Sequence, residues 1–196
     1  MSTMILFVFL ALSISVNAPV QDRCGSVYPE NAPDRPDELV QLHEIKSGLA
    51  ADLLNQLKAK AGFNGEILLC GGYPAKYGIS TVPRKDFYGI SAMIVSDEMI
   101  GFSEKARMGA FAHELGHIFL EHDVRPPSRN AKELYQKEFE ADEFAVRLVG
   151  PDAIREALMN VERVFSLNQW ANDNSKERQR QISARLDRIK KTSIGP

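Results

Sequence analysis

The chain has 196 residues, of which 44% are hydrophobic and 26% are charged, and its formal net charge at pH 7 is −2. This composition is typical of a globular protein and includes no long tract of low complexity. The near-neutral charge gives no reason to expect nucleic acid as a partner. We expect a monomer with one α+β domain over residues 37–196, preceded by two short N-terminal segments.

The first of these segments is a predicted signal peptide over residues 1–18. Residues 5–12 are almost all apolar, and Val16-Asn17-Ala18 is a small-residue cleavage pattern. No Lys or Arg precedes the apolar run, so an uncleaved membrane anchor is the alternative. The apolar run from Met4 to Val16 covers about 13 residues, whereas a membrane span needs about 20. We therefore predict an exported protein, periplasmic or secreted, with no transmembrane helix in its mature form.

The second segment, residues 19–36, is rich in proline and turn-forming residues, and we expect an extended strap there. The chain has two cysteines, Cys24 in this strap and Cys70 at the end of a predicted strand. In an exported protein these two residues are expected to form one disulfide. Closing this loop would stabilise the fold by about 4 kcal/mol on the chain-entropy model.

The early part of the domain is predicted to contain one helix and two strands. Leu and Ile recur at helical spacing over residues 37–61, which predicts a helix that Gly62 ends and that packs behind a sheet. His43 is expected on a solvated or partly packed face of this helix. Residues 66–70 and 87–95 are rich in apolar and β-favouring residues and predict two strands.

The segment His113-Glu114-Leu115-Gly116-His117 carries the most informative pattern of the chain. On a helix with Ser103 as its N-cap, the spacing of the two imidazoles places them on one face, where they can hold one zinc ion. Glu114 would lie beside the metal-bound water. Gly116 would allow a neighbouring backbone to come close. Three apolar side chains are expected to anchor this helix in the core: Leu115, Ile118 and Phe119.

The two histidines need a third protein ligand. Apolar residues at helical spacing from Ala131 to Val149 predict a second helix, which contains Glu138-Phe139-Glu140-Ala141-Asp142. A glutamate from a second packed helix can complete a tetrahedral zinc site with water in the fourth position, and we assign Glu138 to this role. Asp142, one helical turn further, would accept the free ring N–H of a ligand histidine and fix its orientation.

Together the two segments resemble the gluzincin metallopeptidases, in particular the minigluzincins and their membrane-bound relatives, the heat-shock and CAAX prenyl proteases. The likeness covers residues 67–186. It includes residues 93–100, similar to the strand and turn before the active-site helix, and His122, which follows the second histidine. The resemblance implies a small metallopeptidase domain in which a short β-sheet packs on helices and two helices carry the motifs.

The resemblance also implies a zinc-dependent endopeptidase with one Zn²⁺ per chain, bound by His113, His117 and Glu138. Zinc lowers the pKa of its bound water to about 7, and Glu114 acts as general base and later delivers the proton to the departing amine. A peptide or protein substrate would add as a strand to a sheet edge, for which a part of residues 85–92 is the candidate, with a core strand as the alternative. Two alternatives are a zinc-binding scaffold without catalysis and a latent protease of the cell envelope.

Two other zinc-site patterns fit less well. The metzincins need a glycine and a third histidine at positions where this chain has Leu120 and Asp123. His122 is one position from the required histidine and would face about 100° away, so we interpret it as a structural residue or as a support for a ligand. The segment Arg23-Cys24-Gly25 is similar to the inhibitory propeptide of some matrix metalloproteases, in which a thiolate binds zinc, but Cys70 offers a disulfide partner instead.

Gluzincins add a Tyr, His or Arg from a downstream segment to stabilise the oxyanion. The His-Pro and Arg-Ile pairs common in minigluzincin-like proteins are matched only in part by residues 172–182, where the His-Pro is missing. Arg178 and Arg180 are the candidates, with Tyr135 as a third, and a surface position for all three is the alternative. The basic stretch over residues 176–191 has one apolar stripe, which favours a helix docked on the domain over one bound to a membrane surface.

Overall fold

A computed structural model describes the greater part of the predicted domain. The described residues are 23–27, 40–73, 79–82, 90–96, 99, 101–122, 131–167 and 173–193. The predicted signal peptide, residues 1–18, and most of the strap lie outside them. Over the described ranges, no helix is both long and apolar enough to cross a membrane.

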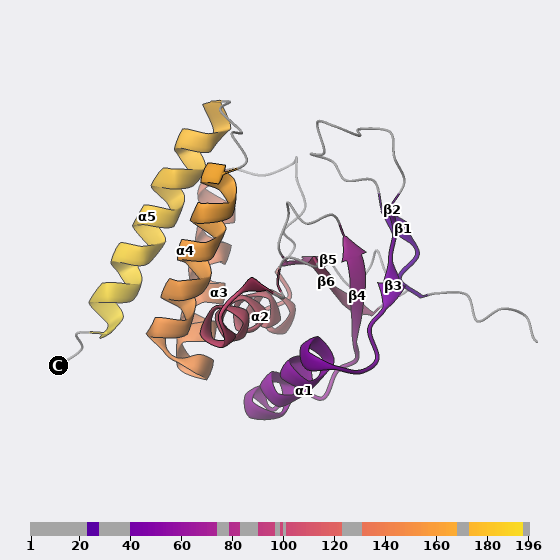
Figure 1. Cartoon of the computed structure of the whole chain (residues 1–196). Coiled ribbons are helices and arrows are strands. Elements are labelled where there is room, and N and C mark those ends of the chain that lie inside the picture. Colours follow the sequence, from indigo (N-terminus) through magenta and orange to yellow (C-terminus); the bar gives the residue numbers. More distant parts are fainter. Residues whose placement is uncertain are drawn as a thin grey trace, which may run out of the picture.

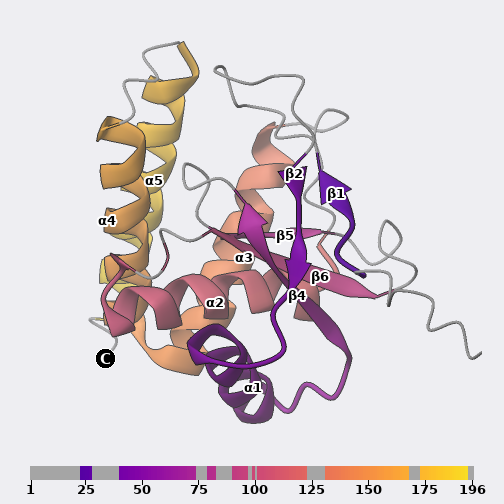
Figure 2. The same cartoon turned by 45° about the vertical axis from the view of Figure 1, so that its right-hand side comes forward.

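This part of the chain folds into the predicted α+β class (Figure 1). The strands are β1 (Ser26–Val27), β2 (Val40–Gln41), β3 (His43–Glu44), β4 (Ile67–Tyr73), β5 (Ile79–Val82) and β6 (Ser91–Ser96). The helices are α1 (Leu49–Ala61), α2 (Glu104–Phe119), α3 (Ala131–Val149), α4 (Pro151–Leu167) and α5 (Asp173–Ser193). Helix α2 lies at the centre, with the sheet on one side and α4 and α5 on the other (Figures 1 and 2).

The larger sheet has the strand order β3-β4-β6-β5, and β1 and β2 form a separate pair. β4 and β6 run parallel, whereas β5 pairs antiparallel with β6. β6 is therefore an internal strand, and it includes Ala92, the last residue of the candidate substrate edge over residues 85–92. For its described part the edge prediction is wrong and the core-strand alternative holds, because a strand paired on both sides has no free backbone groups to offer. Among the described strands, β5 lies at the edge on that side.

The helix predicted over residues 37–61 is wrong over residues 40–48, where β2 and β3 form instead. The helix begins only after Gly48, whose φ of 90° lies outside the helical region. Leu42 is completely buried between β2 and β3, so pairing with neighbouring strands overrides its helical spacing. His43 consequently lies in β3, opposite Gly71 of β4, and not on a helix.

The predicted disulfide between Cys24 and Cys70 is present and links two segments 46 residues apart. Both cysteines are buried, in a small second core on the sheet. Its other buried members are Leu42, Leu68, Ala92 and Ile94. The alternative in which Cys24 binds zinc as a thiolate is wrong, because its sulfur is bonded to Cys70.

Two helix ends are as the sequence predicts. Gly62 ends α1 in the left-handed conformation, with φ of 65°. Ser103 caps α2, since its hydroxyl accepts a hydrogen bond from the backbone N–H of Ala106 at 3.1 Å. Local sequence therefore fixes the C-terminal end of α1 and the N-terminal end of α2.

Helix α2 is anchored in the main core, though not by all three predicted side chains. Leu115 is completely buried and Ile118 is 9% exposed, but Phe119 is 44% exposed. Phe119 lies at the last turn of α2, where it contacts the rings of Phe63 and Phe144 near the surface. The prediction fails for Phe119 because the last turn of α2 lies near the surface, where the core does not cover it.

Helix α5 is docked on the domain, as its apolar stripe predicts. Ile182 and Ile189 are 6% and 5% exposed and belong to the main core. The helix packs against α3 and α4. Its basic residues therefore surround a stripe that the domain itself covers.

The contact of α2 with α4 is close enough to need a glycine. A Cβ atom on Gly109 would lie 2.1 Å from the carbonyl oxygen of Ala153 and 3.0 Å from the Cβ of Ala157. The backbone atom cannot move without moving α4. Gly109 therefore sets the separation of these two helices.

Replacing Gly109 by alanine is expected to lower the free energy of unfolding by about 2 kcal/mol or more, because the helices must separate. Alanine would otherwise favour the helix by about 0.5–1 kcal/mol. Urea denaturation followed by circular dichroism measures this change. Gly101→Ala is the control, since a Cβ there meets nothing within 4 Å. Equal stability of the two variants would contradict the close contact.

Candidate functional site

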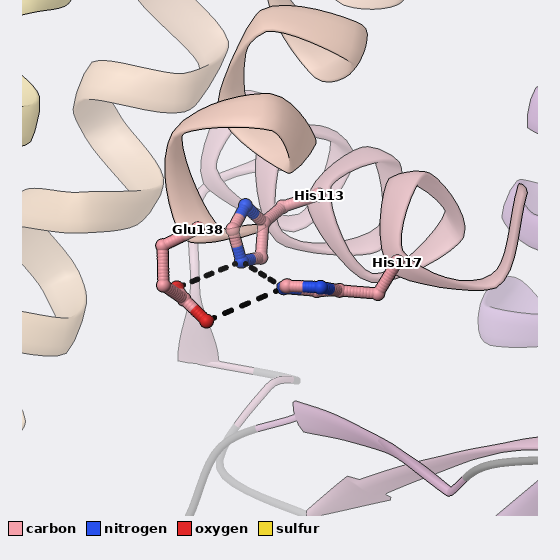
Figure 3. A group of neighbouring side chains, drawn as sticks. All are labelled: His113, His117 and Glu138. Carbon is pink, nitrogen blue, oxygen red and sulfur yellow. Dashed lines mark hydrogen bonds and ion pairs between the residues drawn. The ribbon is translucent and has the colours of Figure 1, made fainter. Parts of the chain in front are cut away.

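Two histidines of α2 and one glutamate of α3 meet where these helices pack (Figure 3). The Nε2 atoms of His113 and His117 are 3.0 Å apart. Oε2 of Glu138 lies 3.3 Å from His113 Nε2, and its Oε1 lies 3.4 Å from His117 Nε2. Among the described residues, this is the one group of His, Cys, Asp and Glu side chains placed to hold a metal ion.

A second glycine brings the two helices together at this point. His113 and His117 are one helical turn apart, so their rings share a face of α2. A Cβ on Gly116 would lie 3.1 Å from both the Cα and the carbonyl oxygen of Ala141 on α3. Glu138, one turn before Ala141, is thereby brought within reach of both rings. The close backbone approach expected at Gly116 is present.

The donor set fits a zinc ion. Two imidazole nitrogens and one carboxylate are the protein ligands of many catalytic zinc sites, in which a fourth position stays open. Around a tetrahedral zinc ion with bonds of about 2.0–2.1 Å, ligand atoms lie about 3.3–3.4 Å apart. The two nitrogens here are 3.0 Å apart, and they lie 3.3 and 3.4 Å from the two different oxygens of Glu138. His113, His117 and Glu138 are therefore close enough together to hold one ion.

Two further charged residues complete the cluster. Asp142, which is buried, places Oδ1 at 2.9 Å from Nδ1 of His113, the contact expected from the sequence. The same carboxylate accepts hydrogen bonds from Nε and Nη2 of Arg185, both at 2.7 Å. Nη1 of Arg185 donates to Glu138 at 2.8 Å. The arginine thus bridges the two carboxylates from α5.

Sequence reasoning missed Arg185, although a signal for it exists. Arg185 lies within the apolar stripe of α5, between the buried Ile182 and Ile189. An arginine inside such a stripe indicates an acidic partner across the helix contact. The spacing of these three residues could have indicated that Arg185 faces the domain, although not which acid it meets there.

The three predicted oxyanion stabilisers fare differently. Arg180 is exposed, because five residues of helix turn its side chain about 140° away from that of Arg185. The side chain of Arg178 lies outside the described residues. Tyr135 is half-buried on α3 and does not line the cavity beside the cluster. The arginine that the structure brings to the cluster is therefore Arg185 and not Arg180.

Burial and pairing fix the charges of the cluster. Burial disfavours the ionised form of Glu138, but its contacts with the His113 and His117 rings outweigh burial and hold the pKa of this carboxyl well below its ordinary value. Burial also opposes ionisation of Asp142, yet the Arg185 guanidinium lowers the pKa of that carboxyl. Both carboxylates are consequently ionised at neutral pH, the form that can bind a cation.

Glu114 lines the same cavity as the cluster. This cavity has a volume of about 210 Å³ and lies between α2 and the helices around it. On its polar side are His113, Glu114, Glu138, Asp142 and Arg185. Its other side is apolar and is formed largely by α4. An acid, a potential metal site and an apolar wall thus share one space.

His122 lies on the side of His117 that faces away from the cluster. Its Nδ1 is 3.0 Å from Nδ1 of His117, and its Nε2 is 3.0 Å from Oε2 of Glu140. The interpretation of His122 as a support for a ligand therefore agrees with its position. His43, in β3, is remote from this group in the fold.

Comparisons with known proteins give no match: no family model, no curated protein and no solved structure is significantly similar to this chain. What the structure shows is a buried His–His–Glu group on two packed helices, consistent with an HExxH…E metal site. The likeness to gluzincins rests on this group and on the motif letters.

Removal of Arg185 is expected to destabilise the fold, because Asp142 and Glu138 would remain buried without their counter-charge. Arg185→Ala should lower the free energy of unfolding by about 3 kcal/mol. Arg188→Ala is the matched control on α5, since its ion pair with Glu143 is exposed and should contribute about 1 kcal/mol or less. Urea denaturation of the metal-free proteins measures both. A loss no larger for Arg185 than for Arg188 would contradict this role.

Proposed function

We propose that this protein is a zinc-dependent endopeptidase that hydrolyses peptide bonds of protein substrates, with one Zn²⁺ per chain. His113, His117 and Glu138 are the proposed ligands. The observation that carries the proposal is that Glu114, the general base expected from the motif, lines the same cavity as two of these ligands, His113 and Glu138. A site that only stores metal has no need of an unligated carboxylate beside it.

The proposed mechanism assigns a task to each residue. A zinc ion in this site would act as a Lewis acid that activates water and polarises the scissile carbonyl. The Glu114 carboxylate takes a proton from the attacking water and passes it to the departing amine nitrogen. Asp142 holds Nδ1 of His113, which keeps Nε2 of that ring directed at the cluster. Arg185 balances the charge of the two buried carboxylates.

The cavity supports a preference for an apolar side chain next to the scissile bond. Its apolar wall comes mainly from one face of α4. These side chains are Ile154, Ala157, Leu158 and Val161. A substrate residue such as leucine or phenylalanine would bury apolar surface there, at roughly 25 cal/mol per Å². A charged side chain would lose its water without gaining a partner.

A second function, that of a latent protease, is favoured by one contact. Nη2 of Arg185 lies 3.4 Å from Nε2 of His113, the nitrogen that would face the metal. A guanidinium at this position repels an incoming cation. A latent enzyme of this kind would gain activity when α5, which carries Arg185, is displaced.

The proposed location is outside the cytoplasm, either periplasmic or secreted. The Cys24–Cys70 disulfide supports it, because such bonds persist in oxidising compartments. The mature chain would begin at Pro19, after the predicted signal peptide. We propose that it acts on peptides or proteins as a monomer and without nucleic acid.

Glu114→Gln is expected to keep its zinc and to lose at least about 100-fold in peptide hydrolysis, because only the proton acceptor is removed. Metal analysis and cleavage of a peptide library, both on the chain from Pro19, measure the two effects. Glu104→Gln, an exposed acid in the first turn of α2, is the control and should leave both unchanged.

A chelator should abolish hydrolysis by the parent chain, and added zinc should restore it. Activity retained in Glu114→Gln would disprove the proposed mechanism. Zinc in both proteins without cleavage in either would favour the scaffold or the latent protease. Cleavage that appears after limited proteolysis would then identify latency.

Val161→Phe is expected to narrow the cavity and shift the preference toward small side chains. The ratio of kcat/KM for leucine peptides to that for alanine peptides should fall about tenfold, since a hydrophobic pocket discriminates by size on this scale. Met159→Phe is the control, because Met159 is 54% exposed on the same helix and does not line the cavity. The same ratio in both variants would show that another surface selects the substrate.

A further inference from the structure

The motif helix ends in a turn that returns a third histidine to the site. Glu121 has φ of 53°, the one non-glycine residue of the described chain with a positive φ. Such a conformation is uncommon for a residue with a side chain and is kept where surrounding contacts require it. The backbone N–H of His122 donates to the carbonyl of His117 at 2.9 Å. The turn therefore folds His122 back onto the helix.

His122 then connects a proposed ligand with a carboxylate. Its side chain is 6% exposed, and its ring meets that of His117 nearly edge-on, with centroids 5.2 Å apart. The nitrogens facing each other are the two Nδ1 atoms, at 3.0 Å, and Nε2 of His122 lies 3.0 Å from Glu140. The second oxygen of Glu140 accepts a hydrogen bond from Gln136 at 2.8 Å. The carboxylate is thus held from two sides.

One arrangement of protons satisfies all of these contacts. His117 needs a free lone pair on Nε2 to bind a metal, so its hydrogen lies on Nδ1. That N–H donates to Nδ1 of His122, which must then carry its own hydrogen on Nε2 and donate it to Glu140. Both rings are neutral in this arrangement.

We propose that His122 and Glu140 are positioning residues that fix the tautomer and orientation of His117 as a metal ligand. The inference rests on the metal site of the proposed function but not on catalysis. Asp142 contacts the Nδ1 of His113 directly. Glu140, two residues earlier on α3, serves His117 through the His122 ring. Each ligand histidine therefore has its own carboxylate, and α3 supplies both.

Zinc affinity tests the relay on the full mature chain, by competition with a chromogenic chelator. His122→Leu should weaken zinc binding by about 10- to 100-fold, the usual effect of losing such a support. His122→Asn should restore most of the affinity, because its carbonyl can accept the His117 N–H at the place of Nδ1. Glu140→Gln should weaken binding, whereas Glu133→Gln, an exposed acid on α3, should not. Unchanged affinity in His122→Leu would overturn the proposal.

The turn provides a test that leaves every ring in place. Glu121→Gly should retain zinc affinity, since glycine adopts the positive φ freely. Glu121→Val should lose affinity, because a β-branched residue disfavours this conformation and displaces His122. Equal affinities in these two variants would show that the turn does not position the ring.

A spectroscopic measurement separates the relay from general stability and from the proposed function. Histidine ¹⁵N–¹H correlation spectra of the metal-free protein should show His117 protonated on Nδ1, and His122→Leu should give a mixture of tautomers. Urea denaturation identifies variants that fold. If the parent chain binds no zinc, the proposed function fails. The spectra of the metal-free protein still show whether His122 fixes the tautomer of His117. The same Nδ1 tautomer in folded His122→Leu would overturn it.

Discussion

The site depends on how closely other helices can approach α2. At Gly109 the backbone of α4 occupies the place of a side chain, and at Gly116 the backbone of α3 does so. The imidazole rings of α2 reach Glu138 only because the backbone of α3 lies close to that of α2 at Gly116. The same contact brings Asp142 and Glu140 to the far sides of the two rings. The two glycines thus allow the close helix packing that positions the cluster.

Charge is the second constraint, because ions buried in a protein persist only when paired. Glu138 and Asp142 are both ionised, and Arg185 is held between them. Burial and the nearby Arg185 lower the pKa of His113, but Asp142 and Glu138 outweigh them and raise it to about 10. In the metal-free protein the His113 ring is therefore an imidazolium at neutral pH, with hydrogen on both nitrogens. A metal ion that binds Nε2 would have to displace the proton from that nitrogen.

Local sequence predicts those parts of the protein in which local forces decide. Helix α3 has the predicted bounds, because its apolar period is uninterrupted. The His113 and His117 spacing and the Ser103 cap are likewise properties of a single helix. Leu42 misled the prediction, since its spacing suits a helix as well as a buried strand, and strand pairing decides between them. Arg185 needed a partner 43 residues away, which no local pattern specifies.

The distance of Arg185 along the chain has a consequence for the order of folding. His113 and Arg185 are 72 residues apart, whereas the two ligand histidines are separated by 4. Contacts between α2 and α3 close shorter loops and are expected to form before α5 docks. Until α5 docks, Glu138 and Asp142 have no guanidinium beside them. Docking of the last helix in the chain is therefore the step that completes the charge balance of the cluster.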